Sequence, residues 1–600
     1  METHVVFLVY LCKSIILKKM KKILIFSLLM AMMFTISCSS KQSSNNNNGN
    51  YADRVLKNGT IYTVNDKNPN AQAIAIKDGK IIYVGSDEGV QKFIGDNTDV
   101  ENLRGKFVLP GFIDTHAHFV TGGMLSKAVT LKLDDSVEQW KKDIKAFADA
   151  NPNEKGVFGI GIYALRFGKN GPTKEELDEL VPNRPAVIID EGGHSAWFNS
   201  KAYELAGITK DTPDPIPGVH MYQRKPNGEP SGWNKEAMTI FPLIKKLNLV
   251  SPEMIAKGGE EVFELLPAIG LTAYHDAGMM QMEELMYPAL ASLEKEDKLT
   301  VKVVGSYMVQ SPTQVPIAVD KIKEYNKKYA SKLIRPNTIK IHNDGTLEAK
   351  TAALHKDYSN EKGHKGGILL EGDVLKNFVS DIARNDVNVH IHAIGDRTIT
   401  ESLDAVEFAR KEVPNTKSRF SVAHVVLIQD KDVPRFGQLD VVAQTTPAWI
   451  TTEEIDNPDL GAERSKKRYR IKSIENGGAK ITLGSDFPVG GEFGLYPFYN
   501  IEAAMTRKGF DKDSQVLPYE NEKMSLESMI KGYTINAAYQ LNMENEIGSL
   551  EIGKWADIIV LSDNPFEIET NEIHDIKIKE TIMNGKTTYT RKWYYWLFGY

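Results

Sequence analysis

The middle of the chain repeats a short apolar segment with the composition of a β-strand eight times, and amphipathic segments separate most of the repeats. In "VLKNFVSDIARNDV" and "TITESLDAVEFARKEV", apolar residues recur near positions i, i+3 and i+4, which is typical of a helix. Strands that alternate with helices form parallel sheets, and eight such units close into a barrel. We therefore predict an α/β protein with a (β/α)8 TIM-type barrel. Its predicted strands begin at Phe112, Leu271, Val301, Thr338, Asn388, Phe420, Asp440 and Lys480.

Several of the predicted strands end in side chains that bind metals or transfer protons. In such barrels the chemistry takes place at the carboxyl ends of the strands. His116 and His118 stand two apart in the first strand and point to one face, so both rings can reach one ion. His390 and His392 repeat this spacing, and either both point inward or His390 supports the metal ligands from behind. The strand-end candidates are His116, His118, Lys340, His392, His424 and Asp486.

The stretch between the first and second predicted strands, about 150 residues, is too long for a single strand–helix unit. We predict an insertion over about residues 125–265 that leaves from the active-site face and is placed to form a lid. His194 is a candidate pocket residue within it, and Trp197 is either a pocket residue or part of its core. Near the ends of other strands, His275 and Trp449 are further candidates for substrate contact.

Hairpin signals flank the predicted barrel on both sides. "RVLKNGTIYTV" and "AQAIAIKDGKIIYVG" alternate apolar and polar residues around Asn-Gly and Asp-Gly turns, and "IKETIMNGKTTYT" does so near the other end. Neither piece is large enough to bury much alone, so we predict one small β-sandwich built from both. The predicted organisation is a sandwich from residues 51–108 and 546–590, a barrel over 109–545, and an aromatic tail at 591–600.

The first 50 residues have the pattern of an export signal followed by a polar tether. From Met20 the chain has a basic start, an apolar run and a small residue before Cys38, which resembles a bacterial lipoprotein signal. The apolar run is short for a bilayer-spanning helix, whereas acylation of Cys38 anchors a protein by its lipid chains. We expect a lipid-anchored protein of the cell envelope, in the outer membrane or facing the periplasm. An uncleaved membrane anchor is the alternative.

Charge and cysteine content exclude several classes of protein. The formal net charge of -6 provides no basic field for nucleic acid. Cys12 and Cys38 are the only two cysteines, so the chain after the signal has neither a disulfide framework nor a cysteine zinc site. Any metal must be bound by histidine, carboxylate or a modified lysine.

Five motifs follow one another along the chain in a fixed order. They are "LPGFIDTHAHF", "VNVHIHAIGDRTI", "RFSVAHVVLIQDKDVPRFGQLDVVAQTTP", "ITLGSDFPV" and "IGSLEIGKWADIIVLSDNP". Together they resemble the amidohydrolase superfamily, in particular the amidohydrolase family 3 branch that includes N-substituted formamide deformylases. The resemblance runs from about Asp53 to about Lys586 and includes "AVIIDEGGHSAWFNSKAYELAGI" and "GEPSGWNKEAM" of the predicted insertion.

The resemblance implies a centre of two zinc or similar divalent ions. His116 and His118 would hold the more buried ion, and Lys340, carboxylated by carbon dioxide, would bridge the two. The second ion would be held by His392 and His424, and Asp486 would be both ligand and general base. From the residues alone, Lys340 is equally compatible with an exposed strand position, in which case the site holds one metal.

The activity that the resemblance implies is hydrolysis of a carbon–nitrogen bond other than a peptide bond. One metal polarises the carbonyl of a small N-acyl or N-formyl amine, a metal-activated hydroxide attacks it, and Asp486 passes the proton to the leaving amine. Two alternatives are a metal-dependent ring deaminase and a catalytically inactive lipid-anchored binding protein. We expect no nucleic-acid partner and membrane attachment through the lipid anchor, and a homo-oligomer is compatible with the sequence.

Overall fold

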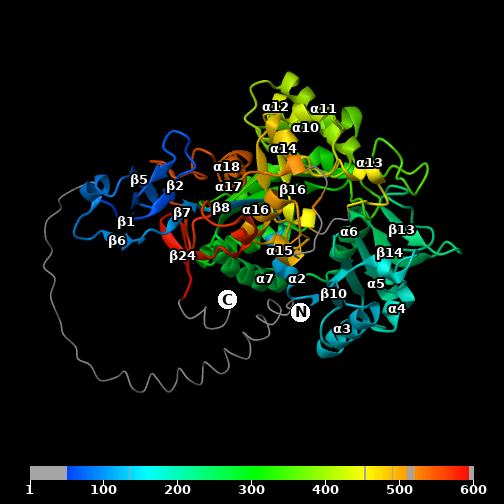
Figure 1. Ribbon diagram of the computed structural model, residues 1–600. Coiled ribbons are helices and arrows are strands. Elements are labelled where there is room, and N and C mark those ends of the chain that lie inside the picture. Colours follow the sequence, from blue (N-terminus) through cyan, green and yellow to red (C-terminus); the bar gives the residue numbers. More distant parts are fainter. Residues whose placement is uncertain are drawn as a thin grey trace, which may run out of the picture. The chain divides into compact units, whose positions relative to one another are not determined.

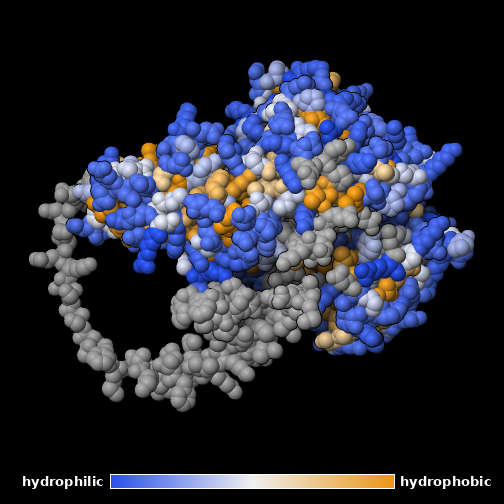
Figure 2. Space-filling model, viewed as in Figure 1, coloured by the Kyte–Doolittle hydropathy of each residue, from blue (hydrophilic) through white to orange (hydrophobic). Residues whose placement is uncertain are grey.

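The computed structural model describes residues 51–592, except for 134, 452–454, 490, 510–515 and 518–519. The predicted export signal, Cys38 and the tether lie outside the described residues, as does most of the predicted aromatic tail. None of the helices in the described part of the chain is long and apolar enough to span a bilayer. On the face shown in Figure 2, hydrophilic residues cover most of the coloured surface and hydrophobic residues form smaller patches.

The central element is a sheet of eight strands whose neighbours are parallel and adjacent in the chain (Figure 1). Each strand overlaps one of the eight predicted apolar segments, and every residue of most of the strands is buried, as is usual for parallel sheets. In chain order the strands are β8 (Phe112–Ala117), β15 (Leu271–Asp276), β16 (Lys302–Val309), β17 (Ile334–His342), β18 (Asn388–Ala393), β19 (Phe420–His424), β20 (Val441–Thr445) and β21 (Ile481–Leu483).

The first and last strands of this sheet, β8 and β21, meet and nearly close the barrel. The backbone N–H of Asp486 donates to the carbonyl of His116 (2.7 Å), and that of His118 donates to the carbonyl of Phe487 (2.8 Å). Gly484 permits the approach, because a Cβ atom there would lie 2.6 Å from the backbone nitrogen of His116. The same contacts bring Asp486 next to the two histidines of the first strand. The predicted TIM-type barrel is confirmed.

Helices follow the strands and pack around the barrel (Figure 1). The longer ones are α7 (Pro252–Leu265), α8 (Glu283–Lys295), α9 (Ala318–Tyr329), α10 (Gly372–Arg384), α11 (Asp396–Glu412), α16 (Pro497–Thr506) and α17 (Leu526–Tyr533). Shorter ones are α2 (Phe119–Leu125), α12 (Val433–Gln438), α13 (Ala462–Ser465), α14 (Ile471–Asn476), α15 (Gly491–Gly494) and α18 (Ile535–Gln540). Their apolar faces and the outer faces of the strands share one hydrophobic core.

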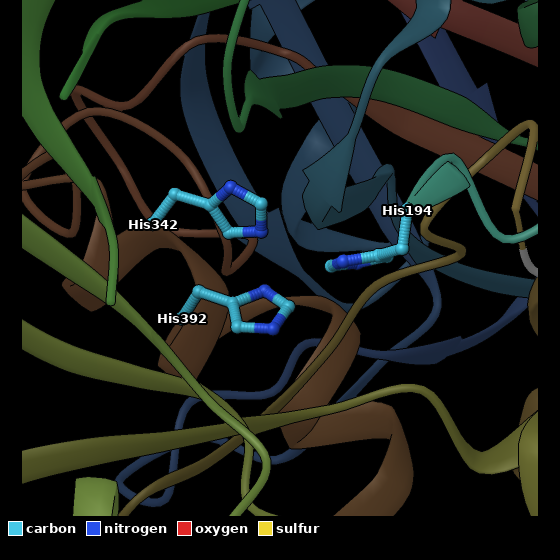
Figure 3. A group of neighbouring side chains, drawn as sticks. All are labelled: His194, His342 and His392. Atoms are coloured by element: carbon cyan, nitrogen blue, oxygen red, sulfur yellow. The ribbon is translucent and has the colours of Figure 1, made fainter. Parts of the chain in front are cut away.

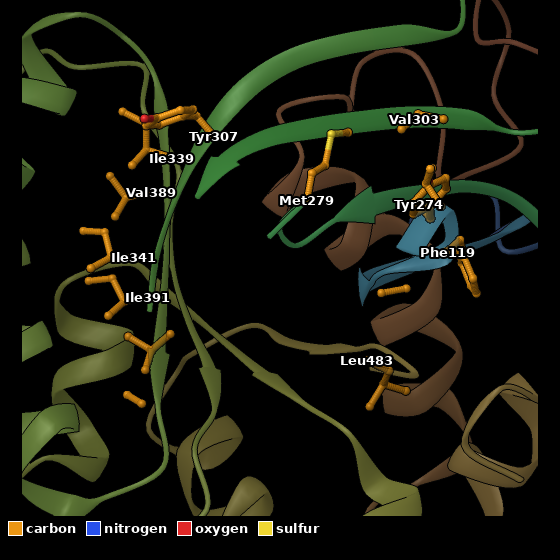
Figure 4. Packing of buried hydrophobic residues seen from close by; sticks show 14 of the residues in the cluster. Phe119, Tyr274, Met279, Val303, Tyr307, Ile339, Ile341, Val389, Ile391 and Leu483 are labelled. Atoms are coloured by element: carbon orange, nitrogen blue, oxygen red, sulfur yellow. The ribbon is translucent and has the colours of Figure 1, made fainter. Parts of the chain in front are cut away.

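The two-residue period of the strands separates this core from the polar centre of the barrel. Ile339 and Ile341 of β17 and Val389 and Ile391 of β18 belong to the hydrophobic core, and Figure 4 shows their side chains in one row. The residues between them point to the opposite face, towards the barrel axis. Those positions hold lysine and histidine, so the alternation places polar groups together at the carboxyl ends.

The residues between β8 and β15 form a second sheet, as expected for a long insertion after the first strand. Its strands are ordered β13-β14-β12-β11-β10-β9. The elements are β9 (Val129–Thr130), α3 (Val137–Ala150), β10 (Val157–Ile162), α4 (Lys174–Asp178), β11 (Ala186–Asp190), β12 (Ser195–Phe198), α5 (Ser200–Ala206), β13 (Met221–Arg224), β14 (Pro230–Lys235) and α6 (Ala237–Leu247). Trp197 is fully buried in the core of this unit with Trp140 and Ile188, so it is a packing residue.

Both flanks of the barrel contribute to a small β-sandwich, also as predicted. One sheet is β5-β4-β1-β6, and the other is β24-β23-β22-β7-β2-β3, in which strands from the two ends of the chain pair. The strands are β1 (Arg54–Lys57), β2 (Thr60–Tyr62), β3 (Asn70–Ala71), β4 (Ala73–Lys77), β5 (Lys80–Gly85), β6 (Asp99–Asn102), β7 (Phe107–Pro110), β22 (Ile558–Leu561), β23 (Ile578–Met583) and β24 (Lys586–Thr590). Leu56, Ile74, Val108 and Ile558 share its hydrophobic core.

Candidate metal centre

Two groups of side chains that could bind a metal lie at the carboxyl ends of the barrel strands, and the insertion contributes one residue to the second group. The inner group consists of His116, His118 and Asp486, all buried. The three-histidine group consists of His194, His342 and His392, of which the first two are half-buried. Within each group the possible ligand atoms lie within 4.8 Å of one another.

In the inner group, the two histidines direct the same ring nitrogen towards one carboxylate. The Nε2 atoms of His116 and His118 each lie 3.4 Å from Oδ1 of Asp486. The opposite nitrogen of each ring is held in place, since Nδ1 of His118 lies 2.8 Å from the carbonyl of Gly278 and Nδ1 of His116 lies 3.2 Å from Oε1 of Gln444. Histidine ligands of metal ions are oriented in this way, by a second hydrogen bond on the far side of the ring.

His390 lies behind His116 and supports it. Its Nε2 is 2.9 Å from Nδ1 of His116, and its own Nδ1 is 2.7 Å from the hydroxyl of Ser421. The two alternatives for the spaced pair on β18 therefore do not exclude each other, because His390 points towards the barrel axis and also supports a ring of the inner group. His275 packs its ring against His390 at 4.9 Å, with Nδ1 3.2 Å from the carbonyl of Thr115.

Lys340 reaches the inner group from β17. Its Nζ lies 3.3 Å from Nε2 of His116, and the residue is 1% exposed, which excludes an exposed strand position. Burial lowers the pKa of Lys340 to about 7, against the opposing effect of the Asp486 carboxylate. A large share of the side chain is therefore neutral amine at neutral pH, the form that reacts with carbon dioxide.

His424 lies between the two groups, with its ring centroid 4.6 Å from that of His116 and 4.5 Å from that of His392. It is 1% exposed, and neither of its ring nitrogens has a hydrogen-bond partner in the described part of the chain. Trp449 stacks on it at 5.0 Å. His424 (φ 72°) and Asp486 (φ 52°) both have left-handed backbone conformations, which are uncommon outside glycine and often found at functional sites.

Most of these histidines are in the neutral state that can bind a cation. Burial, reinforced by neighbouring positive groups, holds the pKa of His116, His392 and His424 well below its usual range, so the rings are neutral. Burial also acts on His118, but the hydrogen bond and charge of Asp486 outweigh it and raise the pKa. Neutral imidazole and carboxylate are the ligands that zinc and similar ions prefer. The donor set, together with the unpaired ring nitrogens of His424, fits a divalent metal.

The three-histidine group joins the insertion to two barrel strands. His342 and His392 are opposite each other in the register of β17 and β18, and their rings are 4.6 Å apart. His194 comes from the turn between β11 and β12 and lies 5.2 Å from His342 and 5.6 Å from His392. Figure 3 shows the three rings around one space. Burial opposes the charge of His194, but Glu236 raises its pKa to about 9.

Two residues of this region, His342 and Glu236, are absent from the sequence-based prediction. His342 follows Lys340 by two positions, the same spacing as the histidine pairs in β8 and β18, and that spacing is a signal for it. Glu236 has no local signal, because it meets His194 only through the folding of the insertion.

An apolar cavity lies beside the centre. The space within it that a water-sized group can reach is only ≈ 20 Å³, and the residues that line it include Gly193 and Pro488, close in sequence to His194 and Asp486. Its walls come from the barrel and the insertion and include Met124, Leu125, Phe158, Ile189, Phe241 and Met282. An apolar group of a molecule bound at the centre would enter this space only if the side chains that line it moved apart.

Comparison with known proteins agrees with this geometry. Residues 99–589 match the family described as the amidohydrolase family. The chain is 29% identical to the protein LONG AFTER FAR-RED 3 of Arabidopsis thaliana, over 90% of this chain and 92% of the relative. It is 26% identical to an N-substituted formamide deformylase of Arthrobacter pascens, over 90% and 98%.

A solved structure with the same fold is described as an uncharacterized metal-dependent hydrolase from Pyrococcus furiosus. It superposes with a TM-score of 0.66 and 25% sequence identity, covering 86% of this chain and all of that one. The match to the family extends from the sandwich through the whole barrel and contains every strand-end candidate. The chain therefore belongs to the amidohydrolase family.

Proposed function

We propose that this protein hydrolyses the carbon–nitrogen bond of small N-formyl or other N-acyl amines. Membership of the amidohydrolase family, the metal-dependent hydrolase of the same fold and the formamide deformylase relative make it a metal-dependent hydrolase of carbon–nitrogen bonds other than peptide bonds. The observation that carries the proposal is the convergence of the Nε2 atoms of His116 and His118 on the Asp486 carboxylate, 3.4 Å from each.

Two divalent ions such as Zn²⁺ are the proposed cofactors. His116, His118 and Asp486 would hold the first ion, and His392 and His424 would hold the second. Lys340, as a carbamate, would bridge the two, and its burial and 3.3 Å approach to His116 support that role. When bound, such ions supply Lewis acidity that activates water and polarises a carbonyl.

The chain's own residues would carry the proton and shape the site. Asp486 accepts a proton from the attacking water and passes it to the nitrogen of the leaving amine, as a general base and then a general acid. Trp449, stacked on His424, covers one side of the site and is a proposed substrate contact together with His194 and His275. The products are a carboxylate and an amine.

The apolar cavity bears on the kind of substrate. Its walls include Leu125, Phe158 and Phe241, so a substrate group that packs against them is hydrocarbon rather than charged. We propose that this group is the substituent on the nitrogen or the larger acyl group, with the carbonyl at the inner group.

A substrate panel tests the proposal. The full chain, stripped by chelator and reconstituted with Zn²⁺, is offered N-formyl and N-acetyl amines with small, aliphatic and aromatic substituents, and the release of amine and carboxylate is measured. Hydrolysis that depends on the metal and favours apolar substituents supports the proposal. Release of ammonia from a ring substrate without a carboxylate would identify a deaminase, and metal binding without turnover would indicate a binding protein.

Carbon dioxide provides a test of Lys340. Reconstitution with Zn²⁺ in buffer free of carbon dioxide is expected to leave low activity, which bicarbonate restores, because the carbamate forms from the neutral amine and carbon dioxide. The Lys340→Met variant should show low activity in both buffers. Equal activity of the wild-type protein with and without bicarbonate contradicts the carbamate.

The proposed cellular location is the cell envelope, with a lipid on Cys38. The Cys38→Ser variant is expected to move to the soluble fraction, since it has no acyl chains to hold it in the bilayer. Continued membrane association of this variant would favour an uncleaved anchor.

A further inference from the structure

We propose that the second divalent ion is bound by three histidines, His194, His342 and His392, and that it fastens the insertion to the barrel. The inference rests on the proposed metal dependence, because this ion belongs to the same centre. It adds His342 and His194 to the ligands, and it gives the metal a structural role in closing the site.

The spacing of the three rings fits one ion. Zinc binds imidazole nitrogen at about 2.0–2.1 Å, so two nitrogens on the same ion are at most about 4.2 Å apart. The nitrogens of the three-histidine group lie within 4.8 Å of one another, and small side-chain rotations close the difference. His342 and His392 already stand side by side, with ring centroids at 4.6 Å. The barrel thus supplies two ligands and the insertion the third.

His194 is held in position for this task. Its Nδ1 lies 2.8 Å from Oε2 of Glu236, and its carbonyl accepts the backbone N–H of Glu236 at 2.7 Å. The carboxylate is fixed in turn by the hydroxyl of Thr351, which donates to Oε1 at 2.5 Å. A carboxylate on the far nitrogen of a histidine orients the ring and raises its basicity, and it is a common partner of metal-bound histidine. The other nitrogen, Nε2, faces the two barrel histidines and would bind the ion in place of its proton.

The backbone around Glu236 bears strain that this arrangement explains. Glu236 is 1% exposed and has φ 66°, a conformation that costs energy for any residue other than glycine. Gly345 lies against it, since a Cβ atom there would meet Oε1 of Glu236 at 2.4 Å. A buried carboxylate in a strained position needs a compensating function, and the orientation of His194 provides one.

The turn that carries His194 is short and well braced. Oδ1 of Asp190, at the end of β11, accepts the backbone N–H groups of His194 and Ser195 at 3.0 Å each. An ion on His194 would therefore hold the turn between β11 and β12 to β17 and β18, beside the apolar cavity. Loss of the ion would free this turn and open the site.

Metal content of variants tests the ligand assignment. Full-length wild-type protein and variants are dialysed against Zn²⁺, and bound zinc is measured by mass spectrometry and calorimetry. His342→Gln is expected to lose one equivalent and retain the other. Glu236→Gln is expected to weaken the same equivalent by about 10–100-fold. His364→Gln, a histidine outside both groups, is the matched control and should bind as the wild-type protein does.

The outcomes separate this inference from the proposed function. If wild-type protein binds no zinc, both fail. If His342→Gln and His194→Gln keep every equivalent of the wild-type protein with unchanged affinity, only the inference fails. Asp486→Asn should weaken binding of the first ion, the one assigned to His116, His118 and Asp486. If Asp486→Asn and His342→Gln lost the same equivalent of zinc, the two ions would not have separate ligands, and the inference would also fail. Thermal melting in the absence of zinc shows whether each variant folds.

Hydrogen exchange tests the fastening of the insertion without using activity. Zn²⁺ is expected to slow the exchange of backbone amides at residues 190–195 in the wild-type protein and not in His342→Gln. Equal protection by Zn²⁺ in both proteins would show that the ion does not act through this group and would overturn the inference.

Discussion

At the scale of single residues, the centre is built from rings that are fixed on one side and open on the other. His116 is held at Nδ1 by Gln444 and His390, and His118 by the carbonyl of Gly278, so each presents Nε2. The two rings would need little rearrangement to bind an ion, because their Nε2 atoms already point to Asp486. Preorganisation of this kind is what gives a site both affinity and catalytic effect.

The Asp486→Asn variant tests the proposed base. Asparagine keeps the size of the side chain but accepts no proton, so kcat should fall by about 10²–10⁴-fold while the protein remains folded. Steady-state kinetics and circular dichroism measure the two effects. Asp563→Asn, at an exposed carboxylate, is the control and should leave kcat unchanged. Full activity of Asp486→Asn would remove this residue from the mechanism.

Part of the centre could be predicted from the sequence at this scale, and there is a physical reason why the rest could not. His116 and His118 were accessible because a spacing of two in a strand determines the face to which side chains point. The meeting of His194 with Glu236 and Thr351 joins three separate segments, and no local pattern encodes it. His342 had the right spacing after Lys340 but stood outside the motifs that carried the resemblance.

At the scale of elements, strand alternation explains why a mostly hydrophobic sheet has a polar centre. β17 and β18 send isoleucine and valine to the helices and lysine and histidine to the barrel axis. All eight strands were predictable because short buried strands alternate with amphipathic helices in a regular order. The internal order of the insertion sheet was not predictable, since it pairs strands in the order β13-β14-β12-β11-β10-β9, which differs from the chain order.

Replacing Trp197 by alanine tests whether this side chain stabilises the insertion sheet. Trp197 is fully buried, and its indole N–H donates to the carbonyl of Thr173 at 2.6 Å. The Trp197→Ala substitution is expected to lower the stability of the insertion against local unfolding by about 3–5 kcal/mol, because it leaves a cavity and an unpaired carbonyl. Hydrogen exchange of β11 and β12 should accelerate, with a smaller effect for Trp197→Phe. Unchanged exchange with an altered Michaelis constant would point instead to substrate contact.

At the scale of the whole described unit, the barrel and the sandwich are joined by a buried ion pair. Nζ of Lys302, at the start of β16, lies 2.5 Å from Oδ2 of Asp557, just before β22, and both side chains are 3% exposed. Asp557 also accepts the backbone N–H of Asn584 at 2.9 Å. The pair connects the amino end of a barrel strand to the sheet formed by both ends of the chain.

Breaking this pair is expected to destabilise the protein more than breaking a surface pair. Asp557→Asn leaves the Lys302 charge buried without its partner, which costs about 3–5 kcal/mol. The exposed pair Lys145–Asp149 is the control, and Asp149→Asn should cost about 0–1 kcal/mol. Denaturant unfolding measures both variants. Equal stability of the two would show that the buried pair does not hold the units together.

The family and the reaction class were accessible from sequence at this largest scale, because five motifs occur in order and each falls at or next to a barrel strand or in the sandwich. The substrate was not accessible in the same way. The apolar cavity beside the centre, the proposed contact for its substituent, is lined by segments far apart in the chain, including Leu125, Phe241 and Met282, which come together only in the fold.

The most direct test of metal-dependent carbon–nitrogen hydrolysis is the metal content of the full chain, measured on the same sample as the hydrolysis of N-formyl and N-acyl amines. We expect about two equivalents of Zn²⁺ or a similar ion per chain, and amine release that a chelator abolishes and added metal restores. Protein that binds no divalent ion, or that hydrolyses these amines equally well after complete removal of metal, would contradict the proposed centre.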